Sequence, residues 1–350
     1  MPKKKLLVRK DFPPAPTFKG DARKVKQGWD LYEHGISYSL LSKFIVCRER
    51  FRLRVVEGLK HRGSNDAMDF GTVFHKALEL SAQGKSRTAI QRHFNNLQRK
   101  ESRKKHKTYD PIRCKLVSMM VDHYKAYWTD VLKEIQYFES EQVFQVPFKT
   151  STGHIVPING KRDEGYIKDK KIWLQENKTK TQINETQIVE TLPFMLQPMI
   201  YLTSFQHDHP GKKIGGILYN IVRNPSITHK KKQSVAAYIE EVSKDIDNRP
   251  EHYFKMFEVD IDDEHLEMWK KLHLDPILSS LCIWWDSIKS NPFDPWVLED
   301  GTPNPHHTIR PFGVYDPLSR GVGDFFGRIV HGTDVGLDID HNLFPELEED

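Results

Sequence analysis

The clearest candidates for chemistry in this sequence are two carboxylates and an ammonium group between Asp163 and Lys178. If residues 172–179 form a strand, Glu176 and Lys178 project to the same face, because alternate side chains of a strand point the same way. That face then changes from aliphatic to charged, and buried charge is costly unless it is paired or bound to a metal. A strand running antiparallel alongside would bring Asp163 to the same edge.

This combination suits the hydrolysis of a phosphodiester bond. Mg²⁺ prefers oxygen ligands, and a bound metal activates a water molecule and offsets the charge that grows on the phosphate. An ammonium group two residues further on orients the water or stabilises the pentavalent state. Asp163, Glu176 and Lys178 are therefore candidate catalytic residues. Taken alone, the pattern D-x(12)-E-x-K is loose and favours an ordinary salt bridge on an edge strand, so the catalytic prediction also depends on the motifs described below.

Helices are expected on the N-terminal side of these strands. Helical spacing of apolar residues predicts one helix that Ser37 or Ser39 caps, and another from Thr72 to Ala82 that begins after Gly71. Residues 87–134 are predicted to be further helix, basic at first and aromatic later.

The middle of the chain alternates strands with helices. Period-two alternation and polar turns predict strands at 141–148, 161–167, 172–179 and 214–222. Helices are expected at 192–206, 234–246 and 263–290, and irregular structure beyond them. Central strands with helices before and after them predict one α/β core that carries helical additions.

The composition excludes several classes of protein. The 350 residues are 38% hydrophobic and 29% charged, and they contain no apolar run of about 18 residues that could span a membrane. The N-terminal stretch lacks the apolar core of a secretory signal. The three cysteines, Cys47, Cys114 and Cys282, lie far apart and form no CxxC pair. We therefore expect a cytoplasmic protein in a reducing compartment, with no disulfide scaffold.

Charge is unevenly distributed around a net value of +5. Residues 85–115 hold eleven Lys or Arg against two acids, whereas residues 334–350 hold seven acids and no Lys or Arg. Basic residues can neutralise phosphates of a nucleic acid, although a solvated helix face is the simpler reading of such a block. The predicted DNA-contacting cations are Arg103, Lys104, Lys105, Lys230 and Lys231.

These features suggest a division of the chain into three parts. Residues 1–30 are predicted to be a basic, partly disordered arm, and residues 31–330 a single nuclease domain with a helical insertion at about 85–135. Residues 331–350 form an acidic tail. Apolar residues among its acids make this tail a candidate docking peptide for a replication or recombination protein, and a disordered solubilising end is the alternative.

Several motifs in a fixed order resemble the PD-(D/E)xK nuclease superfamily, in its RecB-like and phage-exonuclease branch. Residues 39–47 resemble the opening S-x-L-x-x-F-x-x-C helix of that branch, and residues 71–79 its GxxxHxxLE motif. Asp163 and Glu176-Asn-Lys178 match the metal-binding and catalytic positions, and residues 197–201 the QxxxY motif. The resemblance implies a restriction-endonuclease-like core, with a central mixed β-sheet flanked by helices.

The resemblance also implies roles for individual residues. His75, Asp163, Glu176 and the carbonyl group of Asn177 are expected to hold one or two Mg²⁺ or Mn²⁺ ions. Glu79, one helical turn from His75, is expected to support it.

Two further residues are implied to contact DNA. Gln197 and Tyr201 are expected to steady the strand near the scissile phosphate. Pro198 suggests that their helix begins there, which leaves Gln197 near its cap.

One departure from the branch concerns an iron–sulfur cluster. Relatives pair a cysteine like Cys47 with three C-terminal cysteines, but residues 303–315 contain none. We expect no cluster, and a buried core thiol at Cys47.

The sequence leaves three functions open. The first is a metal-dependent DNA exonuclease acting on ends in phage or bacterial recombination or replication, a preference that rests on the resemblance to the histidine-bearing branch. No G-x-x-x-x-G-K-[ST] motif is present, so no ATP-driven motor is expected. The second is a defence or restriction endonuclease, and the third a catalytically silent DNA-binding scaffold. A bacterial or phage-infected cytoplasm and a homo-oligomer are compatible with the first.

Overall fold

The computed structural model describes residues 29–46, 48–61, 66–102, 107–290, 337–339 and 343–344. The contacts divide the chain into two compact units: a first unit of residues 1–63, 143–161 and 266–350, and a second unit of residues 64–142 and 162–265. The structure does not describe residues 1–28 of the predicted arm, Cys47, Arg103 to Lys105, residues 303–315 or most of the acidic tail. The predicted division into arm, nuclease domain and tail stays a prediction.

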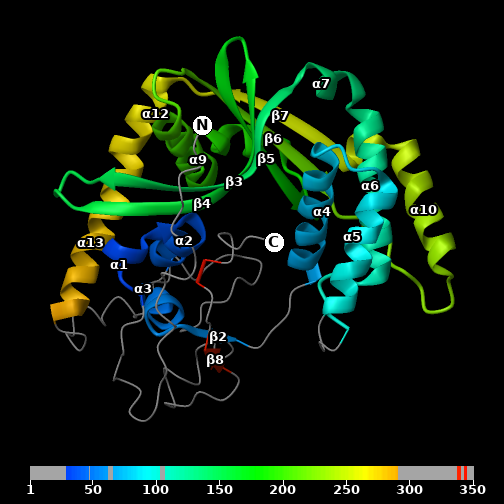
Figure 1. Ribbon diagram of the computed structural model, residues 1–350, viewed down its shortest axis with the longest axis horizontal. Helices are drawn as coiled ribbons and strands as arrows, with labels where there is room; N and C mark the ends of the chain where they lie inside the picture. The colour runs from blue at the N-terminus through cyan, green and yellow to red at the C-terminus, as the bar shows by residue number, and fades with distance from the viewer. Residues whose placement is uncertain are drawn as a thin grey trace. The chain divides into compact units, whose positions relative to one another are not determined.

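A mixed sheet of six strands flanked by helices confirms the predicted α/β class (Figure 1). Its order is β1-β4-β5-β6-β7, with β3 beside β4. The strands are β1 (Ile36–Ser37), β3 (Gln136–Lys149), β4 (Ile155–Lys168), β5 (Lys171–Lys180), β6 (Ile214–Arg223) and β7 (Phe254–Asp260). Parallel pairing joins β5 to β6 and β1 to β4, and antiparallel pairing joins β4 to β5 and β6 to β7.

The hairpin of β4 and β5 in the second unit follows the predicted pattern. Its two turn residues, Asp169 and Lys170, have φ values of 52° and 63°. Positive φ at both central residues is the geometry that matches the twist of a two-residue hairpin. The register that follows pairs Tyr166 with Trp173 and Glu164 with Gln175. The predicted strands at 161–167 and 172–179 are therefore confirmed, although β4 begins earlier, at Ile155.

Helices of the second unit enclose a core of their own. They are α4 (Asp66–Ala82), α5 (Arg87–Lys100), α6 (Pro111–Tyr127), α7 (Thr129–Glu134) and α10 (Val235–Asn248). Side chains of Ser86, Asp110 and Ser234 cap α5, α6 and α10 by accepting backbone N–H groups. In Figure 1, α4, α5, α6 and α10 gather on one side of β5 and β6, and α9 (Leu196–Asp208) lies on the other.

One expectation for these helices was wrong in detail. Gly71 lies inside α4, because that helix begins at Asp66 rather than after the glycine. The described part of residues 87–134 is helical as predicted, and it is divided into α5, α6 and α7. The Asp110–Pro111 pair starts α6 at a position where proline needs no N–H partner.

Shorter elements complete the second unit. They are α8 (Glu185–Thr191), the 3-10 turn η3 (Leu192–Phe194) and α11 (Pro250–Tyr253). Pro198 lies in the first turn of α9, as its missing N–H requires. Strand β7 was not predicted.

The first unit packs around aromatic rings. Its elements are α1 (Leu31–His34), α2 (Tyr38–Val46), α3 (Arg48–Phe51), η2 (Arg52–Val56), β2 (Leu59–His61), α12 (Asp263–Trp269, which begins in the second unit), η4 (Lys270–Leu274), α13 (Asp275–Ser290) and β8 (Leu337–Ile339). The ring centroids of Trp29 and Trp285 lie 4.8 Å apart, and Trp284 packs edge-on against Phe44 and Phe51. Strand β8 pairs with β2 in a region that the sequence predicted to be irregular.

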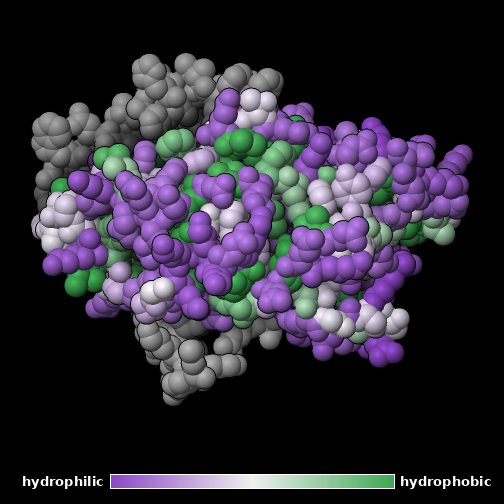
Figure 2. All heavy atoms as spheres, turned by 90° about the horizontal axis from the view of Figure 1, so that it is seen from above, coloured by the Kyte–Doolittle hydropathy of each residue, from purple (hydrophilic) through white to green (hydrophobic). Residues whose placement is uncertain are grey.

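Hydrophilic residues cover most of the face shown in Figure 2, with hydrophobic side chains exposed in small groups. Among the residues that the structure describes, no helix is long and apolar enough to cross a membrane.

Close packing at Gly216 makes a test of the sheet. A Cβ added there would lie 2.2 Å from the Val259 carbonyl oxygen and 2.6 Å from the Trp173 ring. Because that carbonyl belongs to the paired strand and cannot yield, Gly216→Ala should lower the free energy of unfolding by about 1–3 kcal/mol in urea titrations. The control is Gly84→Asn, at an open turn with φ of 76°, which asparagine tolerates. Equal losses in the two variants would contradict the packing argument.

Candidate active site

The β4–β5 register brings the predicted catalytic residues to one place. Glu164 pairs with Gln175, so Asp163, one residue earlier, lies opposite Glu176. The Asp163 carboxylate also accepts a hydrogen bond of 2.7 Å, through Oδ2, from the backbone N–H of Asn177. Asp163 is thus fixed to the strand that carries Glu176 and Lys178, as the alternation of side chains suggested.

Glu176 and Lys178 form an ion pair on one face of β5, between the Lys178 Nζ and the Glu176 Oε1 atoms. The Glu176 side chain is fully buried, and its Oε2 atom has no hydrogen-bond partner among the described residues. Burial raises the pKa of Glu176 to about 7, although the Lys178 ammonium group opposes the shift. The Lys178 ammonium group therefore compensates the negative charge of the buried Glu176 carboxylate only in part.

The Lys178 side chain remains a cation in this setting. Burial alone lowers the pKa of Lys178, but the carboxylates of Glu176 and Asp163 outweigh it, and the pKa lies above its usual value. Lys178 can therefore act as a fixed positive charge, and it is poorly suited to remove a proton at neutral pH.

Helix α4 carries His75 to the same place. The His75 Nδ1 atom lies 3.8 Å from the Asp163 Oδ1 atom. A close approach of the helix to β5 allows this, because a Cβ at Gly71 would lie 3.0 Å from the Thr179 Oγ1 atom. Glycine leaves room there for the helix backbone.

A third possible ligand, Glu141, was not predicted. One donor atom from each of His75, Glu141 and Asp163 lies within 4.8 Å of the others. Glu141 lies within β3 with a φ of 50°, a left-handed conformation that costs a residue other than glycine of order 1–3 kcal/mol. An acid inside a strand pattern gives no sequence signal for such a role. The strained backbone next to other ligand-type groups is the only marker, and it needs the structure.

These groups fit a divalent cation. Two carboxylates and an imidazole converge beside a buried carboxylate with an orphaned oxygen, and Mg²⁺ and Mn²⁺ favour carboxylate oxygens. A cation placed among them would supply the positive charge that Lys178 alone does not. Glu176 is not among the three residues whose donor atoms lie within 4.8 Å of one another. Its carboxylate is a neighbour of that group, because it interacts electrostatically with Asp163 and His75.

A buried polar network centred on Asn177 lies beside the Glu176–Lys178 pair. Its side chain donates to the Glu164 carboxylate through Nδ2 and accepts through Oδ1 from Gln175 at 3.1 Å and Asn220 at 2.7 Å. Gln175 in turn accepts from the Tyr137 hydroxyl at 2.8 Å. The side chain of Asn177 is thus committed to this network while its backbone N–H holds Asp163.

Glu164 is the acid of that network. Burial, and then the neighbouring charge of Asp163, holds the pKa of Glu164 well above its usual range. Glu164 was not predicted as a site residue, because the neighbouring Asp163 matches the expected position.

A second anchor, Arg162, ties β4 to α9. Its guanidinium is 2% exposed and donates to Glu139 at 2.7 Å, Ser204 at 2.8 Å and Asp208 at 2.9 Å. It also lies 4.5 Å from the ring centroid of Phe205. Because these hydrogen bonds go to carboxylates and a hydroxyl group, they fix the residue next to Asp163 against the helix that carries Gln197 and Tyr201.

Among known protein families, the model of the PD-(D/E)XK nuclease superfamily matches residues 35–272 of this chain. The chain belongs to this superfamily. The match spans well over half of the sequence, and His75, Asp163, Glu176 and Lys178, which the sequence analysis predicted to form the site, all lie within the matched range. No curated protein matches the chain. A nuclease of this superfamily acts on nucleic acid with divalent metal ions, which agrees with the donor set described above.

A solved structure is also similar to this nuclease. It is described as the crystal structure of SSO0001, with 15% identity, and the match covers 60% of this chain and 84% of that one. The TM-score is 0.23, so no argument rests on the likeness.

The remaining predicted site residues are placed as follows. Gln197 donates through Nε2 to the Tyr201 hydroxyl at 3.0 Å, within the first turns of α9. Glu79 pairs with Lys76 at 2.9 Å and accepts from Gln83 at 3.1 Å, and no contact joins it to His75 among the described residues. Lys230 lies 3.8 Å from Glu241, and Lys231 is exposed.

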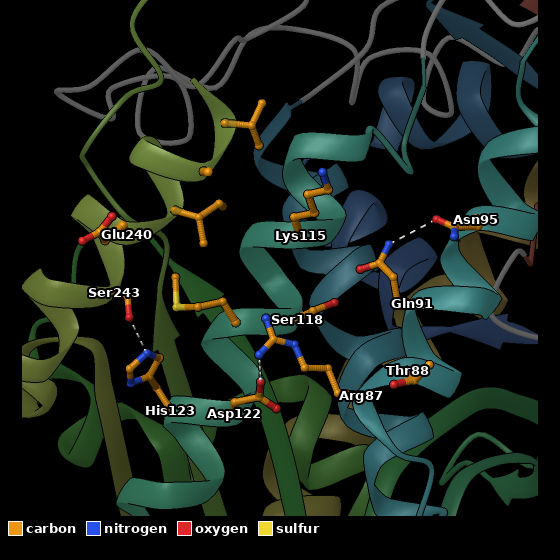
Figure 3. Close-up of a pocket in the computed structure, with 14 residues that line it drawn as sticks. Arg87, Thr88, Gln91, Asn95, Lys115, Ser118, Asp122, His123, Glu240 and Ser243 are labelled. Atoms are coloured by element: carbon orange, nitrogen blue, oxygen red, sulfur yellow. Dashed lines mark hydrogen bonds and ion pairs between the residues drawn. The ribbon is translucent and has the colours of Figure 1, made fainter. Parts of the chain in front are cut away.

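A broad groove of about 880 Å³ runs between α5, α6 and α10 of the nuclease (Figure 3). Arg87 pairs with Asp122 at 2.9 Å on its rim, and His123 binds Ser243 at 2.9 Å. None of the predicted catalytic or metal-binding residues lines it. The groove is therefore separate from the site on β4 and β5.

The raised pKa of Glu176 predicts a pH dependence in metal-free protein. The folded state binds this proton up to about pH 7, whereas the ordinary value is 4.5, so the unfolded chain releases it at lower pH. The free energy of unfolding should fall by roughly 3 kcal/mol as the pH rises through this window, because the charge must then be buried. Glu176→Gln should remove this part of the slope.

The measurement is urea unfolding in EDTA at several pH values from 5 to 8, with Glu190→Gln at an exposed position of α8 as the control. Equal slopes in wild type and Glu176→Gln would refute the burial of an ionisable Glu176.

Proposed function

We propose that this nuclease is a metal-dependent DNA exonuclease that hydrolyses phosphodiester bonds from DNA ends, in phage or bacterial recombination or replication. The observation that carries a nuclease function is the convergence of the Glu176–Lys178 pair with His75, Glu141 and Asp163. The preference for ends rests on the resemblance of the motif around His75 to the exonuclease branch.

Under this proposal, His75, Glu141 and Asp163 hold a Mg²⁺ or Mn²⁺ ion, and the free oxygen of Glu176 faces it. The carbonyl group of Asn177 remains a further candidate ligand. When bound, the metal activates a water molecule and stabilises the charge on the phosphate. The ligand groups supply two or more negative charges, which a divalent cation matches.

Lys178 orients the attacking water and stabilises negative charge on the phosphoryl oxygens. Because it stays protonated beside Glu176, its role is that of a fixed cation. A fixed charge costs no reorganisation at the moment of reaction, and the Glu176 contact holds it in place.

The DNA strand would be steadied by α9 and by surface cations. Tyr201 and Gln197, already joined by a hydrogen bond, are positioned together on one face of that helix. Lys230 and Lys231 are exposed and would contact phosphates, with Lys230 exchanging its ion pair with Glu241 for a phosphate group. Arg103, Lys104 and Lys105 belong to the same proposal by sequence alone.

Activity assays test the proposal directly. Purified protein is incubated with end-labelled linear DNA and with covalently closed circles, in Mg²⁺, Mn²⁺ or EDTA. We expect shortening from an end only with metal, intact circles, and a loss of several kcal/mol of transition-state stabilisation in Lys178→Ala, which abolishes easily measured turnover. The matched control is Lys170→Ala in the β4–β5 turn, which should keep activity.

Other outcomes favour other functions. Cleavage of circles would make the protein an endonuclease. DNA binding without cleavage under any metal would make it a silent scaffold, and the exonuclease proposal would be abandoned.

Glu141 gives an independent test of the metal site. Glu141→Gln retains the size of the side chain and removes one charged ligand, so the affinity for Mn²⁺ should fall on the order of tenfold or more. Calorimetry of Mn²⁺ binding measures this without reference to activity, and Glu134→Gln at an exposed position serves as the control. Unchanged Mn²⁺ affinity in Glu141→Gln would remove this residue from the site.

A further inference from the structure

A small polar pocket opens immediately beyond Lys178, at the C-terminal end of β5. Its volume is about 320 Å³, and its lining consists of Thr179, Lys180, Thr181, Gln182 and Asn224. Every one of these side chains carries a hydrogen-bonding group, and none is an acid. The pocket is therefore built for a polar ligand that bears no positive charge.

Hydrogen bonds between two parallel strand ends fix the walls of this pocket. Lys180 on β5 pairs with Arg223 on β6, and the Asn224 backbone N–H donates to the Lys180 carbonyl oxygen at 2.9 Å. The Arg223 guanidinium donates to the Thr181 carbonyl oxygen at 3.0 Å. Because these contacts use the backbone, the side chains of Thr179, Lys180 and Asn224 remain available to a ligand.

Lys180 brings an uncompensated positive charge to the pocket. Within the described part of the chain, its ammonium group has no carboxylate within ion-pair distance, whereas Lys178 pairs with Glu176. Its Nζ atom lies 5.9 Å from the ring centroid of Tyr219, a weaker contact than an ion pair. Lys180 is only partly exposed, so bulk water compensates it less than it would a surface lysine.

The charge and the donors together favour an anion with several oxygen atoms. A phosphodiester group offers two such oxygens to an ammonium group and to hydroxyl or amide donors. Lys178 and Lys180 are two residues apart on one strand, so they project to the same face about 6.6 Å apart along it. That separation is comparable with the distance between successive phosphates of one DNA strand.

We propose that Lys180, with Thr179, Thr181 and Asn224, binds the phosphodiester group next to the scissile one on the strand being cut. This inference rests on the proposed nuclease function, because it takes the scissile phosphate to lie beside Lys178. This contact would be independent of the DNA sequence, since phosphate oxygens carry no direct sequence information. It fixes which bond of the strand faces the metal-binding residues.

Salt dependence of DNA binding measures this contact. Binding of a fluorescent oligonucleotide is followed by anisotropy at several salt concentrations, with Ca²⁺ replacing Mg²⁺ so that affinity is recorded apart from cleavage. Loss of one phosphate contact in Lys180→Gln should reduce the slope of log K against log salt by about 0.7–0.9. Lys180→Arg keeps the charge and should restore most of the slope. The matched control is Lys171→Gln, an exposed lysine at the opposite end of β5, which should keep the wild-type slope.

Neutral phosphates locate the contact on the substrate. In a series of oligonucleotides, one methylphosphonate at a time replaces a phosphodiester at successive positions around the cleaved bond, and binding and cleavage are measured. With wild type and Lys171→Gln, neutralising the group adjacent to the cleaved bond should weaken binding. With Lys180→Gln, the same replacement should have no further effect, because the partner charge is already absent.

The outcomes separate this inference from the proposed function. If wild type binds DNA but cuts none, the exonuclease proposal is wrong, while the difference in salt slope between wild type and Lys180→Gln still decides the phosphate contact. Equal slopes, or an unchanged methylphosphonate profile in a Lys180→Gln protein whose circular dichroism is native, would overturn the subsite. A wild-type protein that does not bind DNA would overturn both.

Discussion

Burial of the Glu176 carboxylate inside the central strand β5 is the constraint on which the rest of the site depends. An ionised carboxylate without adequate partners is unstable in such a place, and one lysine offsets only part of the cost, as the raised pKa of Glu176 shows. The remaining imbalance is what a divalent cation between His75, Glu141 and Asp163 would correct. Under the proposed function, metal affinity and the instability of the metal-free site have the same electrostatic origin.

Hydrogen bonds from the surrounding residues hold the charged groups of the candidate site in position. Asn177 does this from two sides, since its backbone fixes Asp163 while its amide side chain is held by Glu164, Gln175 and Asn220. Arg162 does the same at larger scale by joining β3, β4 and α9 through carboxylates and a hydroxyl. Satisfied networks of this kind make a local geometry rigid, because any displaced member would leave buried polar groups unpaired.

Much of the sheet could be predicted because it depends on local signals. Alternation and a polar turn were enough to locate β4 and β5 and to place Asp163 opposite Glu176. The helix that carries His75 was predicted to begin at Thr72, because Gly71 was interpreted as a helix boundary. In the structure Gly71 lies inside α4, where the close approach to Thr179 leaves no room for a side chain.

The residues that escaped prediction act through tertiary contacts. Glu141 reaches the other ligands only through an irregular backbone in β3, and a lone arginine such as Arg162 resembles a surface residue until its three acceptors are known. Lys180 lies only two residues after Lys178, so the sequence does not distinguish its role from that of Lys178. The pocket beside Lys180 is formed by the ends of β5 and β6 together, and it can be recognised only from the structure.

The absence of a side chain at Gly71 affects how accurately α4 positions His75. A methyl group there would meet the Thr179 hydroxyl oxygen at 3.0 Å, closer than ordinary contact, so α4 would have to retreat by a few tenths of an ångström. Ligand distances in metal sites are held within about 0.2 Å. Under the proposed function, a shift of a few tenths of an ångström would exceed this tolerance. The position of His75 at the metal would then depend on the absence of a side chain at Gly71, one helical turn away.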